Sequence, residues 1–89
     1  MNTEFKESFL RDLRTIKDRA LLERIKEVIE RVEQAPKVQD LANLKKLKGE
    51  RNYYRFRVGD YRIGLKIEGP LVTFVRILNR KDIYKYFPR

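Results

Sequence analysis

The chain has 89 residues, carries 22 Lys and Arg against 13 Asp and Glu, and has a formal net charge of +9 with 42% hydrophobic residues. Such a length supports one domain, residues 1–89, around one small hydrophobic core. The chain has no cysteine, which excludes disulfides and thiolate chemistry, and no histidine, the commonest metal ligand, so we expect no metal and no other cofactor.

The hydropathy pattern indicates a cytoplasmic protein without a membrane partner. No stretch approaches the roughly 18 consecutive apolar residues of a membrane span. The N-terminus carries Glu4, Lys6 and Glu7 before any apolar run, which is unlike a signal peptide.

The positive charge lies in the C-terminal half of the chain. Residues 1–43 carry nine basic and nine acidic side chains, whereas residues 44–89 carry thirteen basic and four acidic ones. A positive field on one side of a small domain favours a nucleic acid or an acidic protein as the partner.

A short edge strand at residues 1–5 and two helices are predicted at the N-terminus. Apolar residues recur at helical spacing from Lys6 to Ile16, and again from Leu21 to Val32, where Asp18 is the predicted N-cap. Ala35 and Pro36 end the second helix. We expect an antiparallel helical hairpin whose exposed surface has no function.

A β-hairpin follows, in which Tyr53–Val58 and Tyr61–Ile67 alternate between apolar and polar residues around a tight Gly59-Asp60 turn. A turn of two residues fixes the register of the strands. The predicted cross-strand pairs are Val58 with Tyr61, Arg57 with Arg62, Phe56 with Ile63, and Arg55 with Gly64.

The two faces of this hairpin differ, because successive side chains of a strand point to opposite sides. The apolar face holds Tyr54, Phe56, Val58, Tyr61, Ile63, Leu65 and Ile67. The opposite face, called the basic face below, holds Tyr53, Arg55, Arg57, Arg62, Gly64 and Lys66.

The predicted pairing of Arg57 with Arg62 is unfavourable for the sheet, because like charges directly opposite each other repel. An anion between the two guanidinium groups would reverse the sign of this interaction. Gly64, opposite Arg55, leaves room for a bulky group to approach the backbone. The alternative is that the arginines form an ordinary solvated sheet face.

A third strand, Leu71–Leu78, is a nearly continuous apolar run of the kind found in strands buried on both faces. If the preceding turn is Gly69-Pro70, Val72 and Phe74 join the apolar face; a three-residue turn would invert them, so the side of Arg76 stays open. Residues 79–87 are predicted to be a polar break and then one helical turn, whose cations and tyrosines lie beside the basic face.

Lysines precede the hairpin in the segment Leu44–Gly49, after a polar loop at residues 37–43. Its two leucines can anchor on the core while the lysines reach solvent beside the basic face. We expect contacts with a phosphate backbone here, the alternative being a solvated patch.

The order helix, helix, LKG, YRFRVGDYRI, turn, apolar strand and NRKDIY resembles the RelE/ParE superfamily of bacterial toxin-antitoxin modules over nearly the full length, most specifically in VGDYRI and RKDIY. The resemblance implies an α+β fold like that of microbial ribonucleases, with a short N-terminal strand, a two-helix hairpin and an antiparallel twisted sheet meander. RelE-like members cleave messenger RNA on the translating ribosome, whereas ParE-like members poison DNA gyrase. A small antitoxin neutralises both.

The resemblance to RelE-like members implies a catalytic set. Cleavage by attack of a ribose 2′-hydroxyl on its own phosphate needs a base, cations for the phosphorane and an acid for the leaving oxygen. Arg62 and Arg55 would clamp the phosphate, Arg80 would stabilise or protonate the leaving side, and Tyr84 would contact a base. The implied catalytic residues are Arg55, Arg57, Arg62, Arg80 and Tyr84, and the expected RNA-binding residues are Lys45, Lys46, Lys48, Tyr53, Lys66, Lys81 and Lys85.

One departure from the RelE-like pattern concerns the general base. The family's strand pair is lysine, but this chain has Arg55 and Arg57, and a guanidinium group is a very poor proton acceptor. Lys66, Lys81 and Lys85 are candidates for this role. Alternatively, the ribosome orients the substrate and the arginines act by electrostatic stabilisation.

Two further hypotheses remain: a ParE-like, non-enzymatic inhibitor of gyrase, and an inactive binding module. Under each hypothesis the expected partner is an acidic antitoxin, partly disordered when free, that lays a helix on the basic face or beside the helical hairpin.

Overall fold

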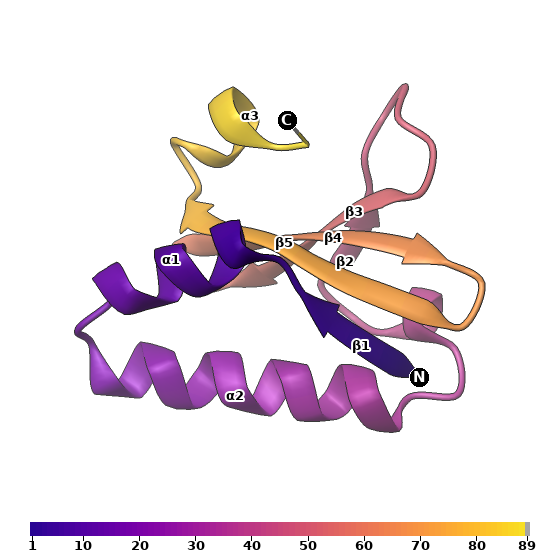
Figure 1. Cartoon of the computed structure of the whole chain (residues 1–89), viewed down its shortest axis with the longest axis horizontal. Helices are drawn as coiled ribbons and strands as arrows, with labels where there is room; N and C mark the ends of the chain where they lie inside the picture. Colours follow the sequence, from indigo (N-terminus) through magenta and orange to yellow (C-terminus); the bar gives the residue numbers. More distant parts are fainter. Residues whose placement is uncertain (89) are drawn as a thin grey trace.

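The computed structural model describes residues 1–88, which form one α+β unit. The elements are β1 (Asn2–Phe5), α1 (Glu7–Thr15), α2 (Arg19–Gln34), the 3-10 helix η1 (Val38–Asp40), β2 (Leu44–Lys46), β3 (Tyr53–Val58), β4 (Tyr61–Glu68), β5 (Leu71–Asn79) and α3 (Ile83–Tyr86). Figure 1 shows α1 and α2 running antiparallel on one side of the sheet and α3 on the opposite side. The predicted fold class is therefore confirmed.

The sheet has five strands in the order β1-β5-β4-β3-β2. The predicted meander of β3, β4 and β5 is confirmed, since each strand pairs antiparallel with the next. The predicted edge strand at residues 1–5 is confirmed as β1, which lies parallel to β5. Strand β2 is an additional antiparallel edge strand, where no strand was predicted. This edge strand adds residues Leu44–Lys46 to the side of β3.

The register of the β3–β4 hairpin is as predicted from its turn. Arg57 pairs with Arg62 and Arg55 with Gly64, and the other two predicted pairs also occur. The apolar face is buried against the helices through Phe56, Ile63 and Leu65. The opposite face, the basic face, is left to α3 and solvent.

In β5, Glu68 pairs with Leu71, so the preceding turn consists of Gly69 and Pro70, and Val72 and Phe74 join the apolar core. A β-bulge lies further along the strand: Leu65 pairs with Phe74, but its neighbour Gly64 pairs with Arg76, which leaves Val75 as the extra residue. Val75 packs with Ile83 and Phe87 in a second, smaller apolar cluster.

The main core lies between the sheet and the helices. Asp18 caps α2 as predicted, because its Oδ1 accepts hydrogen bonds from the backbone N–H groups of Ala20 and Leu21 at 3.0 and 3.2 Å. The buried face of α2 consists of Leu21, Ile25, Val28 and Val32.

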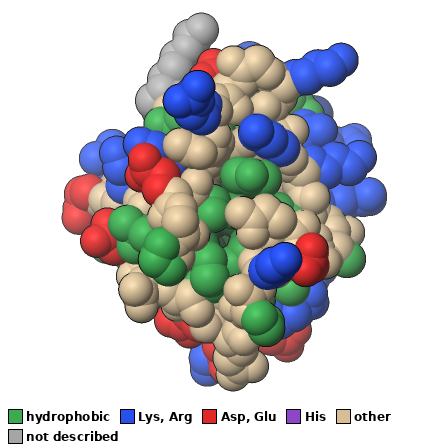
Figure 2. All heavy atoms as spheres, turned by 90° about the vertical axis from the view of Figure 1, so that its right-hand side faces the viewer, with side chains coloured by type: hydrophobic (Ala, Val, Ile, Leu, Met, Phe, Trp, Pro, Cys, Tyr) green, Lys and Arg blue, Asp and Glu red, His purple; other side chains and the backbone are tan. Residues whose placement is uncertain are grey.

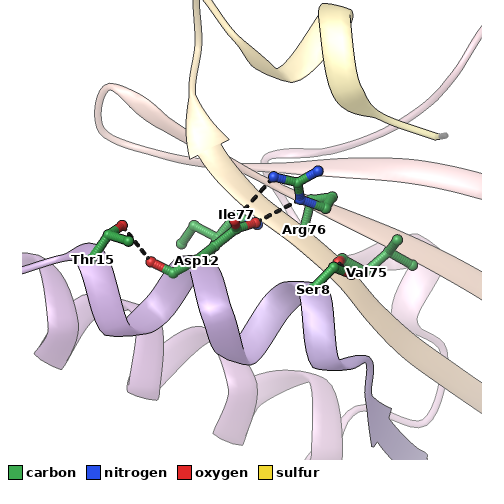
Figure 3. A network of polar contacts seen from close by, with 6 residues as sticks. All are labelled: Ser8, Asp12, Thr15, Val75, Arg76 and Ile77. Atoms are coloured by element: carbon green, nitrogen blue, oxygen red, sulfur yellow. Dashed lines mark hydrogen bonds and ion pairs between the residues drawn. The ribbon is translucent and has the colours of Figure 1, made fainter.

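Helix α1 covers the edge of β5 beyond the point where β1 stops pairing at Phe74 (Figure 3). The Ser8 hydroxyl donates to the Val75 carbonyl at 2.6 Å, and Asp12 Oδ2 accepts from the Ile77 N–H at 3.0 Å. Asp12 also accepts from Arg76 Nε at 2.7 Å and Nη2 at 3.0 Å. The face taken by Arg76, left open by the sequence, is the basic face, because the bulge pairs Arg76 with Gly64. From there its guanidinium group reaches over the edge of β5 to Asp12 of α1.

No helix within residues 1–88 combines the length and the apolar character needed to cross a membrane.

Candidate active site

A pocket of about 260 Å³ lies on the basic face, between strands β2, β3 and β4 and helix α3. It is called the arginine pocket below. The residues that line it are Asn43, Leu44, Lys45, Arg55, Arg57, Arg62 and Tyr84. The structure therefore brings together four of the five predicted catalytic residues and one of the predicted RNA-binding lysines.

Arg62 is held by the turn of its own hairpin. Its Nη1 donates to the carbonyl oxygens of Gly59 at 2.9 Å and Tyr61 at 3.0 Å. Burial lowers the pKa of Arg62, the positive charges of Arg57, Arg55 and Arg80 lower it further, and Asp60 offsets part of this effect. The guanidinium group is thus fixed in place in an environment that disfavours its charge.

The pocket arginines have no acidic partners among residues 1–88. The ion pairs in this part of the chain are Arg14–Glu7, Lys66–Glu68 and Arg76–Asp12, so Arg55, Arg57 and Arg62 form none there, and Asp60 acts on Arg62 only from a longer distance. Converging guanidinium groups without carboxylates suit a phosphate, whose oxygens match their planar forks.

Tyr84 supplies an aromatic ring at the rim of the pocket. It is 62% exposed, and the Arg55 Cζ lies 5.1 Å from the centroid of its ring. This cation–π contact orients the ring while leaving area free for another planar group. A nucleobase could stack there beside a phosphate held by the arginines.

Helix α3 is anchored on the sheet by Ile83 and Phe87, which are both buried. The Phe87 ring lies directly over Gly64, where an ideal Cβ would stand only 2.5 Å from the ring. The prediction that Gly64 gives a bulky group access to the backbone is therefore correct, but that group is the chain's own Phe87.

Arg80 lies near the pocket without lining it. Its backbone N–H donates to the Asp60 carbonyl at 2.8 Å, which ties the end of β5 to the β3–β4 turn, and its charge contributes to the lowered pKa of Arg62. The remaining predicted catalytic residue is thus a neighbour of Arg62.

The predicted RNA-binding residues do not form one surface, because Phe87 covers the middle of the basic face. Tyr53 lies beyond Phe87, with the two ring centroids 5.6 Å apart, and Lys66 Nζ lies 5.7 Å from the Tyr53 ring centroid. Lys66 also lies 3.6 Å from Glu68 Oε1. Both residues are therefore separated from the arginine pocket.

The other predicted lysines are also dispersed. Lys46 pairs with Tyr54 and so points to the side of the sheet opposite the basic face, while Lys46 and Lys48 line a separate hollow of the β2–β3 loop. Lys81 and Lys85 are exposed near α3. Only Lys45 of the predicted set lines the pocket within residues 1–88.

Three residues near the site were missed. Asn43, whose φ is 71°, and Leu44 line the pocket where the chain enters β2. Arg24 of α2 lies against the β3–β4 turn, with its Nη1 3.1 Å from an ideal Cβ on Gly59. Arg24 could not be found from the sequence, because its helical position is that of an ordinary exposed residue.

Figure 2 shows lysine and arginine side chains gathered at the upper right of the end of the molecule that it presents, and acidic side chains mixed with basic ones elsewhere. Within residues 1–88, no group of three or more Asp, Glu, His or Cys side chains could hold a metal ion.

Comparisons with known proteins show which proteins the chain resembles. Residues 3–84 match a family model described as the ParE toxin of the type II toxin-antitoxin system parDE. The chain is 43% identical over 89 residues to Toxin RelE3 of Methanocaldococcus jannaschii, covering 99% of this chain and 100% of the relative.

Two solved structures have the same fold. A chain in the crystal structure of the RelB-RelE antitoxin-toxin complex from Methanococcus jannaschii superimposes with a TM-score of 0.81 at 40% identity, covering 96% of this chain and 99% of that one. A chain of the archaeal RelE-RelB complex from Pyrococcus horikoshii OT3 superimposes with a TM-score of 0.72 at 20% identity, covering 89% and 93%.

Proposed function

Because the chain belongs to the RelE/ParE superfamily and is the toxin of a type II toxin-antitoxin module, we propose that it is an endoribonuclease that cleaves messenger RNA on the ribosome. The observation that carries this proposal is the arginine pocket. Arg55, Arg57 and Arg62 converge there without acidic partners within residues 1–88, next to the exposed ring of Tyr84.

The chemistry that this arrangement supports is transesterification within the RNA backbone. The 2′-oxygen attacks the adjacent phosphorus, the P–O5′ bond breaks, and the products are a 2′,3′-cyclic phosphate and a 5′-hydroxyl. Arg55 and Arg62 bind the nonbridging oxygens and stabilise the extra negative charge of the phosphorane. Arg80, beside Arg62, stabilises the leaving 5′-oxygen, and Tyr84 stacks on a neighbouring base.

Arg57 adds a third guanidinium group to this site. It pairs with Arg62 across the hairpin, so a phosphate between them replaces a repulsion by two attractions. Relief of the repulsion between Arg57 and Arg62 therefore adds to the free energy of substrate binding.

A cognate acidic antitoxin is the proposed regulator. The structural relatives from Methanococcus jannaschii and Pyrococcus horikoshii were crystallised as toxin-antitoxin complexes. An acidic segment that covers the arginine pocket would neutralise its unpaired charges and exclude RNA. Binding should weaken as salt concentration rises, because exposed charges are screened.

The second candidate function is inhibition of DNA gyrase, which is supported by the match to a ParE toxin model. Such an inhibitor needs no phosphate clamp beside an exposed aromatic ring. The 43% identity to a toxin named RelE3 favours the ribonuclease.

Primer extension on messenger RNA tests the proposal. Purified ribosomes programmed with a defined message are incubated with the wild type, Arg62→Ala, and Arg14→Ala as the matched control, since Arg14 lies on α1 in an exposed ion pair with Glu7. Codon-phased cuts with the wild type and the control, but not with Arg62→Ala, are expected. Intact transcripts together with inhibition of purified gyrase would establish the second function instead.

A further inference from the structure

We propose that Lys45 is the general base of the reaction and accepts the proton of the attacking 2′-hydroxyl group. The inference rests on the ribonuclease function proposed above. It addresses a specific gap, since the reaction needs a proton acceptor, and the guanidinium groups of Arg55, Arg57 and Arg62 do not give up their protons at neutral pH.

The register of the sheet places Lys45 with the arginines. Lys45 pairs with Arg55 across the β2–β3 ladder, so both side chains project from the basic face. Lys45 lines the arginine pocket together with Arg55, Arg57 and Arg62. A side chain that ends in an amine therefore lines the same pocket as the three arginines.

The other candidate lysines are in the wrong places. Lys66 lies beyond Phe87, over the ring of Tyr53 and within 3.6 Å of Glu68. Lys81 and Lys85 do not line the pocket. Among residues 1–88, Lys45 is the one pocket residue with an amine that can cycle between protonated and neutral forms.

The neutral amine of Lys45 takes the proton as the 2′-oxygen forms its bond to phosphorus. The P–O5′ bond then breaks, and the leaving 5′-oxygen, stabilised by Arg80, takes a proton from water. The resulting Lys45 ammonium releases its proton to solvent, so the enzyme returns to its starting state. Because only the neutral amine can act, the cleavage rate should rise with pH.

The test separates a base from a mere positive charge. Single-turnover cleavage of ribosome-bound message is measured between about pH 6 and pH 8.5 for the wild type, Lys45→Ala and Lys45→Arg. Lys45→Arg keeps the charge but cannot accept a proton at these pH values. Both variants should lose roughly 10²- to 10⁴-fold in rate and most of the pH dependence, and added ethylamine should partly restore Lys45→Ala.

Lys26→Ala is the matched control, because Lys26 is an exposed lysine of α2, on the side of the sheet opposite α3 and the arginine pocket (Figure 1). It should keep the pH dependence of the wild type. Thermal unfolding of each variant confirms that the exposed substitution leaves the fold intact.

Near wild-type cleavage by Lys45→Arg would overturn the proposal by showing that only the charge matters. A Lys45→Ala variant that keeps the wild-type pH dependence would also overturn it, since another base would then be at work. If the wild type itself leaves the message intact, the ribonuclease function fails first, which is a distinguishable result.

Discussion

The Phe87 ring fills the space that a side chain at position 64 would need. An ideal Cβ on Gly64 stands 2.5 Å from the Cδ1 and Cε1 atoms of Phe87, and Phe87 is buried with Ile83 against Val75. Because Ile83 and Phe87 flank Tyr84 in the chain, this contact determines where the Tyr84 ring lies above Arg55. A glycine in the middle of β4 thus positions a residue of the arginine pocket.

Gly64→Ala should therefore displace α3 and impair the pocket. The new methyl group cannot be accommodated without moving Phe87, and overpacking of this kind costs about 1–3 kcal/mol. We expect a lower free energy of unfolding in urea and a large loss of messenger RNA cleavage.

A second substitution provides the control for this prediction. Phe87→Leu in the Gly64→Ala background shortens the side chain that meets the new methyl group, so it should recover part of both stability and cleavage. If the losses of stability and cleavage in the double variant equal the sum of the losses in Gly64→Ala and Phe87→Leu, the contact between positions 64 and 87 does not position α3.

Arg57→Gln should stabilise the folded protein while weakening cleavage. The substitution removes a like-charge pair with Arg62, which is worth a few tenths up to about 1 kcal/mol. Urea unfolding at low and high salt measures the effect, and the gain should shrink at high salt because Arg57 is exposed. A loss of stability at low salt would mean that the guanidinium group makes a compensating contact.

How much of this site could be predicted from the sequence depends on how local its determinants are. The pairing of Arg57 with Arg62 follows from a two-residue turn between them, so it was predicted correctly. The parallel pairing of β1 with β5, the formation of β2 and the bulge at Val75 depend on contacts between distant segments, which alternation along a strand does not reveal.

The sequence also did not reveal that Phe87 divides the basic face into two parts. Strand alternation put Arg62 and Lys66 on one side, and that is correct, but Phe87 covers Gly64 between them. The position of Phe87 depends on the path of the chain after β5, which strand alternation does not predict. Arg62 and Lys66 therefore lie on the same face of β4 but do not belong to the same site.

Multivalent anions should stabilise the wild type through the arginine pocket. Burial and the neighbouring arginines lower the pKa of Arg62, so folding disfavours its charged form. That cost is relieved as pH rises through the lowered pKa, whereas a bound phosphate relieves it without a change in pH. At ten times its dissociation constant, phosphate would add about 1.4 kcal/mol, or roughly 6–11 °C in melting temperature for a domain of this size.

Differential scanning calorimetry with phosphate or chloride at equal ionic strength measures this shift. The double variant Arg57→Ala/Arg62→Ala reports the general effect of phosphate on protein stability, which must be subtracted. Equal shifts for the wild type and this variant would show that the pocket does not bind phosphate.

Asp12→Ala should be among the most destabilising single substitutions of a polar residue, although Asp12 lies outside the arginine pocket. Its carboxylate accepts hydrogen bonds from Arg76 Nε and Nη2 and from the Ile77 N–H at the edge of β5 (Figure 3). The side chains of Arg76 and Asp12 are only 22% and 12% exposed. Removing the carboxylate therefore leaves a largely buried guanidinium group and a backbone N–H group without an acceptor. We expect the free energy of unfolding in urea to fall by about 2–4 kcal/mol.

Glu7→Ala is the control, because it breaks an ion pair whose side chains are 66% and 69% exposed, and it should lower the free energy of unfolding by under about 1 kcal/mol. Equal losses for the two variants would mean that α1 does not depend on Asp12 to hold the edge of β5.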